Sequence, residues 1–358
     1  MKILAIDTSC DETAVAITSE RRVLANVLYS QVLLHREWGG VVPSIAKRAH
    51  EERIDWVISE ACRRFLRRAV KQNGATRDVV DAAFQDIDYV AVTQGPGLAI
   101  ALEVGIRKAK ELARKYGKPL VPVNHMEGHI YSCFVQNGKG NPQTEIVFPF
   151  LALLVSGGHT ELVLVKDHGS YEVVGQTRDD AAGEALDKAA RLLGIEYPGG
   201  PVIERLAKIV GNKDYYNYPR PMYRSNNYDF SFSGLKTAVL YCTKKMSDKE
   251  RVDNINRIAS SFQEAVVDTL VKKTEDALIH LKIDHLVVGG GVIANQRLRQ
   301  RMRQMIKAYN KTVVFPPYKY LTGDNASMIG VADGMYNSKI ADLCSSMNFS
   351  STYLPTRN

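Results

Sequence analysis

The sequence predicts an α/β protein of two lobes, each built on a mixed β-sheet. A chain of 358 residues with 45% hydrophobic content exceeds the size at which a single core usually stops growing. Strands alternate with helical segments, which is typical of largely parallel α/β layers. A meander of three strands also occurs twice along the chain, with little shared sequence, and this indicates a duplicated architecture.

The first lobe is expected to open with a meander. Strands are predicted at 2–6, 13–18 and 23–28, with a polar turn between the first two. Further along, apolar residues at helical spacing predict one long helix, or two in series, over 44–70. The elements that follow are a strand at 89–93, a helix at 99–116 and a strand at 119–123.

The second lobe repeats this order. Strands are expected at 150–155, 160–165 and 171–174, and the later elements are helices at 183–193, 201–209, 235–245 and 254–281, a strand at 283–288 and helices from about Asn295 and Asn325. We therefore expect the first lobe at 1–120, with a C-terminal helix at about 325–358 packing back on it. The second lobe is expected at 121–324, carrying the metal and nucleotide motifs.

Composition narrows the class of protein. A net charge of +8 and a pI near 9.1 favour a polyanionic partner, for which RNA and an acidic surface both qualify. The five cysteines are odd in number and far apart, which argues against a disulfide framework or a cysteine-built zinc site and favours a reducing cytoplasm. No signal peptide or membrane span is expected, because no apolar run reaches about 18 residues. A processed mitochondrial form is the alternative location.

Two histidines form the most distinctive pattern. His125 and His129 are four residues apart, so a helix would project both imidazoles from one face, where they could hold one metal ion. The segment is similar to a zinc-peptidase signature, but Glu127 lies about 200° around the helix from His125 rather than directly after it. The alternative is a pair of surface or capping histidines.

Three loops that follow strands predict an anion site. Small or glycine residues at 7–13, 156–160 and 289–295 would let backbone N–H groups approach a phosphate closely. Each loop alone is only a turn, and none is a Walker or dinucleotide fingerprint. Downstream, Asp324 offers a hard oxygen ligand beside a helix start, where plain N-capping is the alternative role.

Together these motifs resemble one family. The order and spacing match along nearly the whole chain for the segments 7–11, 39–43, 95–97, 125–129, 156–160, 179–184, 187–188, 197–201, 230–234, 290–295 and 324–326. The chain is similar to the TsaD family of tRNA threonylcarbamoyladenosine transferases, long labelled glycoproteases, and its first motif resembles the bacterial and mitochondrial branch.

The resemblance implies a fold and a reaction. The fold is the two-lobed, actin-like architecture of the sugar-kinase and heat-shock ATPase superfamily. The reaction transfers a threonylcarbamoyl group from threonylcarbamoyl-AMP to N6 of the adenosine 3′ of the anticodon, in tRNAs that read codons beginning with A. Other nucleotide ligands that the resemblance suggests are ATP and AMP.

The resemblance also implies roles for individual residues. The ligands of one divalent metal ion, Fe²⁺ or Zn²⁺, would be His125, His129 and Asp324. The phosphate end of the donor would lie against Leu154, Val155, Ser156, Gly157 and Gly158, and its nucleoside against Asp187, Gly200, Glu204 and Asn295. Further phosphate-loop candidates are Thr8, Ser9, Cys10 and Asp11. For Asp187 the alternative is a helix-surface partner of Lys188 or Arg191, and for Glu204 a solvated position.

Candidate tRNA contacts come from basic residues. In the segment 215–228, tyrosines interleave with Arg220 and Arg224, which would offer stacking faces beside phosphate-binding charges. Two further arginine groups are Arg63, Arg64, Arg67 and Arg68, and Arg297, Arg299, Arg301 and Arg303. Each of these groups has a structural or solvated role as its alternative.

Partners and competing functions follow from the resemblance. A bacterial-type relative would act with a paralogous subunit and a small ATPase, and a mitochondrial-type relative as a homodimer. The competing enzyme is a metal-dependent peptidase, which the position of Glu127 opposes. A non-catalytic paralogous scaffold is the third alternative, and such scaffolds lack the two histidines.

Overall fold

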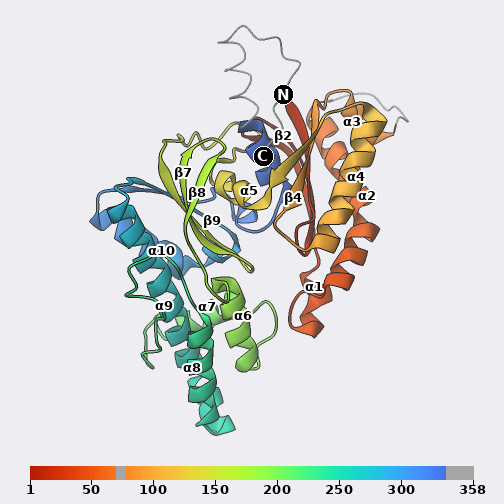
Figure 1. Ribbon diagram of the computed structural model, residues 1–358. Coiled ribbons are helices and arrows are strands. Elements are labelled where there is room, and N and C mark those ends of the chain that lie inside the picture. The colour runs from red at the N-terminus through yellow and green to blue at the C-terminus, as the bar shows by residue number, and fades with distance from the viewer. Residues whose placement is uncertain (70–77, 336–358) are drawn as a thin grey trace. The chain divides into compact units, whose positions relative to one another are not determined.

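Two compact α/β units make up the computed structural model, which describes residues 1–69 and 78–335 (Figure 1). The first unit comprises Met1–Gln31, Pro43–Glu145 and the segment from Asp324 onward. The second comprises Val32–Val42 and Ile146–Gly323. Each unit has its own five-stranded sheet and its own hydrophobic core.

The sheet of the first unit has the order β3-β2-β1-β4-β5. Its strands are β1 (Lys2–Asp7), β2 (Glu12–Ser19), β3 (Arg22–Ser30), β4 (Tyr89–Gly95) and β5 (Leu120–Asn124). The meander β1-β2-β3 is antiparallel, whereas β4 pairs parallel with both β1 and β5. The carboxyl ends of β1, β4 and β5 therefore lie at one edge of the sheet.

Helices cover both faces of this sheet. One face packs on α2 (Pro43–Ala69), α3 (Val79–Phe84) and α4 (Ala99–Tyr116), and the core between them includes Leu4 and Ile6 of β1. The opposite face meets the helical residues 326–335, where a Cβ at Gly330 would lie 3.2 Å from the Cβ of Ala5. The alternation of side chains along β1 explains why neighbouring residues serve different helices. The short helices α5 (His125–Tyr131) and η2 (Ser132–Phe134) follow β5.

The second sheet repeats the topology of the first. Its order is β8-β7-β6-β9-β10, again an antiparallel meander followed by two parallel strands. The strands are β6 (Phe150–Val155), β7 (Thr160–Asp167), β8 (Ser170–Gln176), β9 (His285–Gly289) and β10 (Thr312–Val314). The duplicated α/β architecture predicted from the two meanders is confirmed.

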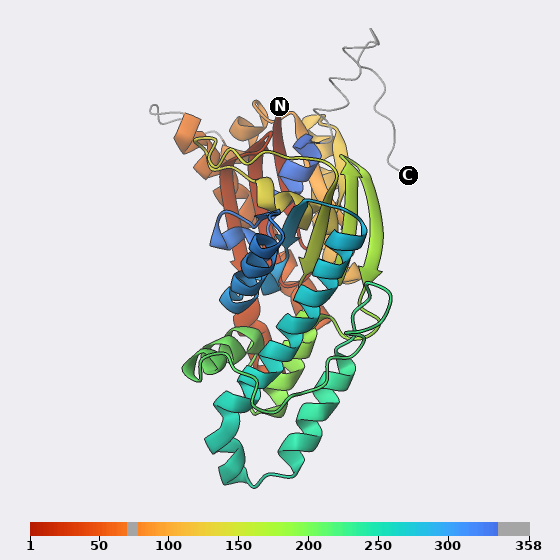
Figure 2. The same ribbon diagram turned by 90° about the vertical axis from the view of Figure 1, so that its left-hand side faces the viewer.

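The helices of the second unit pack together as well as on the sheet. They are α1 (Val32–His35), η1 (Arg36–Trp38), α6 (Ala182–Leu192), α7 (Gly199–Ile209), α8 (Ser233–Lys244), α9 (Asp248–His280), η3 (Gly291–Ala294), α10 (Gln296–Ala308) and η4 (Lys319–Leu321). Figure 2 shows α8 and α9 as a long antiparallel hairpin. The fully buried strand β6 forms the centre of the core with α6 and α9.

The structure corrects the predicted boundaries. The first unit extends to Glu145 rather than ending at 120, because β5 pairs with β4 and keeps the following α5 with the first sheet. The histidine motif therefore belongs to the first unit. The segment Val32–Val42 belongs to the second unit, although it was assigned to the first lobe. Val70 and the predicted helical residues 336–358 lie outside the described residues.

Helix boundaries also differ from expectation in places. The helix predicted from Asn254 begins at Asp248, because Ser247 and Glu250 form a capping box. That Ser-x-x-Glu pattern was present in the sequence. The short elements α3 and β10 were not predicted, since neither is long enough to show a clear periodicity.

Two expectations from composition can be checked on the described residues. No helix in 1–69 or 78–335 combines the length and the apolar character that a membrane crossing requires. Cys10, Cys62, Cys133 and Cys242 form no disulfide bond within the described part of the chain, and Cys344 lies outside it.

Candidate functional site

The two histidines are positioned by a capped helix at the end of β5. Asn124 ends the strand, and its side-chain Oδ1 accepts hydrogen bonds from the N–H groups of Met126 at 2.9 Å and Glu127 at 3.3 Å. This N-cap starts α5 at His125, so that His125 and His129 lie one turn apart on the same face. The predicted helical geometry of the pair is confirmed.

Asp324 reaches the same place from the far end of the chain. The N-cap of the helix at 326–335 is Asn325, whose Oδ1 accepts from the N–H of Met328 at 3.1 Å, so capping does not require Asp324. Close packing brings this helix against α5. A Cβ at Gly128 would lie 2.9 Å from Cδ1 of Ile329, which shows how closely the two helices approach.

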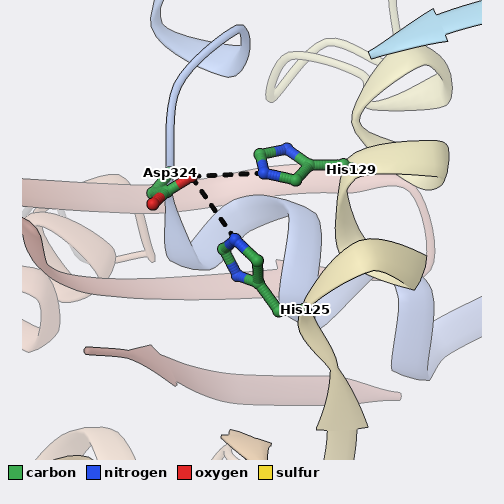
Figure 3. Close-up of side chains that lie close together, drawn as sticks. All are labelled: His125, His129 and Asp324. Atoms are coloured by element: carbon green, nitrogen blue, oxygen red, sulfur yellow. Dashed lines mark ion pairs between the residues drawn. The ribbon is translucent and has the colours of Figure 1, made fainter. Parts of the chain in front are cut away.

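The three side chains converge on one point (Figure 3). Oδ1 of Asp324 lies 3.5 Å from Nε2 of His125 and 3.2 Å from Nε2 of His129. Metal–ligand bonds of about 2.1 Å at tetrahedral angles separate the ligand atoms by about 3.4 Å, so these spacings suit one metal ion. Among the described residues, this is the only cluster of three such side chains with metal-ligand spacing.

Burial and charge support a cation at this point. Both histidines are buried, and Nδ1 and Nε2 of His129 have no hydrogen-bond partner of good geometry among the described residues. Burial lowers the pKa of His125, but the carboxylates of Asp324 and Asp7 outweigh it and raise that pKa to about 9. The pKa of Asp324 is held low by the two histidines despite its burial. The local potential is negative, as a cation requires.

The predicted phosphate loop after β1 has three buried polar side chains, Thr8, Ser9 and Asp11. The hydroxyl of Thr8 donates to the carbonyl of Ala101 at 2.9 Å, whereas Oγ of Ser9 is buried without a described partner. Burial and neighbouring carboxylates, including Asp11 and Asp324, raise the pKa of the Cys10 thiol. A phosphate contact at Thr8–Asp11 stays a prediction.

The loop after β6 retains the features of a phosphate cradle. Ser156 accepts from the N–H of His159 through Oγ at 3.1 Å, which closes the turn. A Cβ at Gly157 or Gly158 would meet no described atom within 4 Å, so neither packing nor a left-handed backbone explains these glycines. In contrast, Gly183 at the start of α6 would place a Cβ 2.5 Å from the carbonyl oxygen of Ser156. The open side of the loop is free for a ligand.

Leu154 and Val155 take a limited part in this loop. Both are fully buried within β6, and Val155 belongs to the hydrophobic core. Their side chains therefore serve the fold, and only their backbone groups are suited to a ligand contact.

Asp187 joins two helices of the second unit. Its Oδ1 accepts from the N–H groups of Gly199 at 2.8 Å and Gly200 at 3.1 Å, at the start of α7. The suggested partners are engaged elsewhere, since Lys188 pairs with Asp180 and Arg191 donates to the carbonyl of Gly39. These hydrogen bonds give Asp187 a structural role at the start of α7.

Glu204 and Asn295 meet at the start of α10. Oε1 of Glu204 accepts from the N–H of Gln296 at 2.7 Å, while Oδ1 of Asn295 accepts from Leu298 at 3.0 Å as the N-cap. Nearby, Gly290 has φ +95°, and a Cβ there would collide with the carbonyl oxygen of Val155. The predicted nucleoside residues are thus tied to helix N-termini, and Glu204 is not a free solvated side chain.

The two arginines predicted to contact tRNA differ in environment. Arg220 forms ion pairs with Asp214 at 2.7 Å and Asp268 at 2.8 Å, so its charge is already neutralised. Arg224 is exposed and forms no ion pair with any described residue. Both line a cavity of about 650 Å³ together with Tyr223 and Asp268. Arg220 has a structural role, and Arg224 is the available cation.

Several members of the other arginine groups are engaged by described carboxylates or an aromatic ring. Arg63 and Arg64 both pair with Glu60, and the side chain of Arg68 lies outside the described residues. The four arginines of α10 form two pairs, because residues four apart lie on the same face of a helix. Arg297 and Arg301 pair with Glu264 of α9, while the guanidinium groups of Arg299 and Arg303 lie about 5 Å from the ring of Phe315.

Sequence reasoning missed the residues that support the histidines. Asn124 and Asn325 are the N-caps, and Asp7 lies beside His125 with Oδ2 at 3.9 Å from Nδ1. The position of Asp7 was open to inference, because the parallel strands β1, β4 and β5 end at the same edge of the sheet. Asp7 ends β1, and His125 follows β5.

The alternative functions do not fit this geometry. Glu127 is buried on α5, but its carboxylate is not part of the cluster that joins the two histidines to Asp324. A peptidase general base is therefore not in place. The intact cluster likewise opposes a non-catalytic scaffold.

Comparisons with known proteins identify the fold and the family. Two solved HypF structures match at TM-scores of 0.55 and 0.57 with 12% and 13% sequence identity, the first being HypF from T. kodakarensis. They cover 94% and 98% of this chain, which spans about half the length of those chains, 48% and 47%. At this identity the likeness concerns the fold alone.

Similarity in sequence is much higher to curated relatives named tRNA N6-adenosine threonylcarbamoyltransferase. The relative from Thermosipho africanus is 46% identical over 93% of both chains, and that from Kosmotoga olearia 45% identical over 92% of both. The relative from Ligilactobacillus salivarius is 44% identical over 92% of this chain and 90% of its own. The family model TsaD, described as tRNA N6-adenosine threonylcarbamoyltransferase, matches residues 22–331. The chain therefore belongs to the TsaD family.

Proposed function

We propose that this protein transfers a threonylcarbamoyl group from threonylcarbamoyl-AMP to N6 of the adenosine 3′ of the anticodon, in tRNAs that read codons beginning with A. The observation that carries the proposal is the cluster of His125, His129 and Asp324, present in a chain of this family. In the reaction, N6 attacks the carbonyl carbon of the mixed anhydride. The bond from that carbon to the phosphate oxygen breaks, AMP leaves, and N6 loses a proton.

The metal would be held by Nε2 of His125, Nε2 of His129 and a carboxylate oxygen of Asp324. This mixed set of nitrogen and oxygen donors is compatible with both Fe²⁺ and Zn²⁺, and three protein ligands leave coordination positions open. When bound, the ion would supply Lewis-acid chemistry at the anhydride and neutralise phosphate charge. The capped helix α5 and the cap at Asn325 fix the backbone that carries these side chains.

The second unit is proposed to bind the nucleotide part of the donor. The open turn at Gly157 and Gly158 suits a phosphate, because backbone N–H groups can approach it without a side chain in between. Asp187, Gly200, Glu204 and Asn295 are proposed to hold the nucleoside and its ribose, because carboxylates accept hydrogen bonds from ribose hydroxyls. The bonds of Asp187 and Glu204 to the starts of α7 and α10 fix the orientation of both carboxylates. Asn295 fixes the start of α10. ATP or AMP would bind through the same groups.

For tRNA we propose Arg224 as a phosphate contact, with Tyr223 beside it in the 650 Å³ cavity. Arg220 stabilises this loop through its ion pairs with Asp214 and Asp268. A paralogous subunit with a small ATPase, or a second copy of the chain, are the two partner sets proposed for activity. A reducing compartment such as the cytoplasm suits the free thiols.

The test joins metal content to product. The wild-type protein and the double variant His125→Ala with Asp324→Ala are purified, and their iron and zinc are measured by mass spectrometry. Each is then incubated with a tRNA transcript and an enzyme that generates threonylcarbamoyl-AMP, with and without candidate partners. We expect the double variant to lose metal and modified nucleoside together.

A matched control uses a histidine outside the cluster. His280→Ala, on the exposed end of α9, should keep both the metal and the modification. Modification retained by the double variant without metal would contradict the proposed role of the ion. Modification by the wild-type chain alone would favour the homodimer over the paralogous partner set.

A further inference from the structure

A buried carboxylate lies behind one of the metal ligands. Asp7 ends β1 and His125 follows β5, so the parallel strands of the first sheet deliver both residues to the same edge. Oδ2 of Asp7 is 3.9 Å from Nδ1 of His125, and the two side chains are only 1% and 6% exposed. On the other side of the ring, Nε2 points to Asp324 (Figure 3).

The hydrogen bonds of Asp7 leave one oxygen aimed at the histidine. Oδ1 accepts from the N–H of Ser9 at 3.1 Å and from Oγ1 of Thr93 at 2.8 Å, which fixes the orientation of the carboxylate. Oδ2 has no hydrogen-bond partner among the described residues, and neither has Nδ1 of His125. These two facing buried groups, an obligate acceptor and a ring nitrogen, therefore have no other hydrogen-bond partner among the described residues.

We propose that Asp7 is a positioning residue that holds His125 in the tautomer needed for metal binding, with a proton on Nδ1 and a lone pair on Nε2. The inference rests on the metal site of the proposed function. A carboxylate only accepts hydrogen bonds, so it favours the proton on the nitrogen that faces it. Closing the 3.9 Å gap by about 1 Å would make a normal hydrogen bond. Such outer carboxylates orient histidine ligands and raise their basicity.

The variant Asp7→Asn separates orientation from packing. Asparagine keeps the shape, and its carbonyl oxygen can still accept from Ser9 and Thr93. Its NH₂ group then faces Nδ1 and, as a donor, favours a lone pair there. The proton moves to Nε2, the nitrogen that must bind the ion.

The experiment measures Zn²⁺ affinity directly, by competition of the metal-free full-length protein with a chromophoric chelator. We expect Asp7→Asn to raise the Kd for Zn²⁺ by about 10- to 100-fold. Thermal unfolding of the metal-free variant should match the wild type. The charge control is Asp11→Asn, which removes an equal charge from the same loop and should raise the Kd far less than Asp7→Asn does.

The outcomes distinguish the inference from the function on which it rests. Equal Zn²⁺ affinity of Asp7→Asn and wild type, or equal losses in Asp7→Asn and Asp11→Asn, would overturn the positioning role while leaving the metal site intact. Failure of the wild type to bind Zn²⁺ or Fe²⁺ would instead remove the metal from the proposed function. If Asp7→Asn does not fold, Thr93→Val decides. This variant keeps the charge but frees the carboxylate, so a raised Kd supports the inference and an unchanged Kd overturns it.

Discussion

At the scale of single residues, the glycines of the second unit divide into two kinds. Gly183 and Gly290 are required by packing, because a Cβ would collide with the backbone of Ser156 or Val155. Gly157 and Gly158 face open space among the described residues and have no packing reason to lack a side chain. Two adjacent glycines of the second kind, at the end of a buried strand, suggest that a ligand uses the space.

Alanine substitutions should separate these two kinds. Gly183→Ala should lower the free energy of unfolding by about 1–3 kcal/mol through overpacking, despite the better helix propensity of alanine. Gly157→Ala should leave stability within about 0.5 kcal/mol but weaken AMP binding. Urea denaturation and calorimetric titration measure the two effects. A stable Gly157→Ala protein with wild-type AMP affinity would contradict a phosphate cradle at this loop.

A second pair of residues tests the tRNA contact. Arg224→Ala should weaken tRNA binding and reduce the slope of log K against log salt by about 1, because one phosphate contact is lost. It should not alter stability, since Arg224 has no ion-pair partner among the described residues. Binding is measured by fluorescence anisotropy across a salt series. An unchanged slope would exclude this contact.

Arg220 serves as the matched comparison. Arg220→Ala leaves the carboxylates of Asp214 and Asp268 without this partner and should cost about 1–3 kcal/mol of stability. A loss of stability in Arg220→Ala, together with a loss of salt-dependent affinity in Arg224→Ala, is the expected pattern. A loss of stability in Arg224→Ala, with a loss of salt-dependent affinity in Arg220→Ala, would contradict this assignment of roles.

At the scale of elements, helix starts organise both units. Asn124 caps α5, which carries the two histidines. Asn325 caps the helix that follows Asp324, and Asn295 caps α10. The start of α8 is held from a distance. Oδ1 of Asp179 accepts from the amides of Phe232 and Ser233, and Oδ2 from the hydroxyls of Ser231 and Ser233. One carboxylate thus joins the end of the second meander to α8.

This carboxylate predicts a pH dependence of stability. Burial raises the pKa of Asp179, but the four hydrogen bonds outweigh it and hold the pKa below its usual range. A lowered pKa in the folded state contributes stability above the unfolded-state pKa of about 3.9, and this contribution is lost as the pH falls through the folded-state pKa. Asp179→Asn should therefore be less stable than wild type at pH 7, and the two should converge in acid.

Urea denaturation between pH 7 and pH 3 measures this difference. Asp253→Asn is the control, since Asp253 is exposed on α9 and has no hydrogen bond to a described residue. Its difference from wild type should stay close to zero across the range. A constant difference for Asp179→Asn would show that its role is packing rather than charge.

At the scale of the whole molecule, the duplication assigns different groups to different units. Both sheets have the same strand order, yet the three candidate metal ligands lie in the first unit and the candidate phosphate turn in the second. Asp324 belongs to the first unit because the helix at 326–335 packs on its sheet through Gly330. Ligands of the two kinds should therefore stabilise separate parts of the chain.

Hydrogen exchange can test this division. Zn²⁺ at 100 times its Kd stabilises the state that binds it by about 2.7 kcal/mol, which slows exchange through unfolding about 100-fold. We expect this protection in α5 and 326–335, and AMP should protect the turn after β6 instead. His129→Ala should lose the first effect and keep the second. Protection by Zn²⁺ confined to the second unit would contradict the assigned ligands.

Much of the architecture could be predicted from the sequence, because its elements have clear periods. Apolar strands and amphipathic helices show the spacing of 2.0 and 3.6 residues on which such predictions depend, and the two meanders revealed the duplication. Short elements such as α3 and β10 carry no such pattern. The lobe boundary was misplaced because the pairing of β5 with β4 is a long-range choice that local spacing does not contain.

The sequence by itself determined the family, the duplicated fold and the residue types of the candidate metal site, because these depend on local order and spacing along the chain. Tertiary structure decided which polar groups are already engaged. Arg220 forms ion pairs, Glu204 is bonded to the start of α10, and Asp187 is bonded to the start of α7. It also brought Asp7 to His125. Contacts between distant segments decide which side chains are buried and which partners they have. Burial and partners in turn decide whether a charged group is stabilised and whether a ring nitrogen donates or accepts a hydrogen bond.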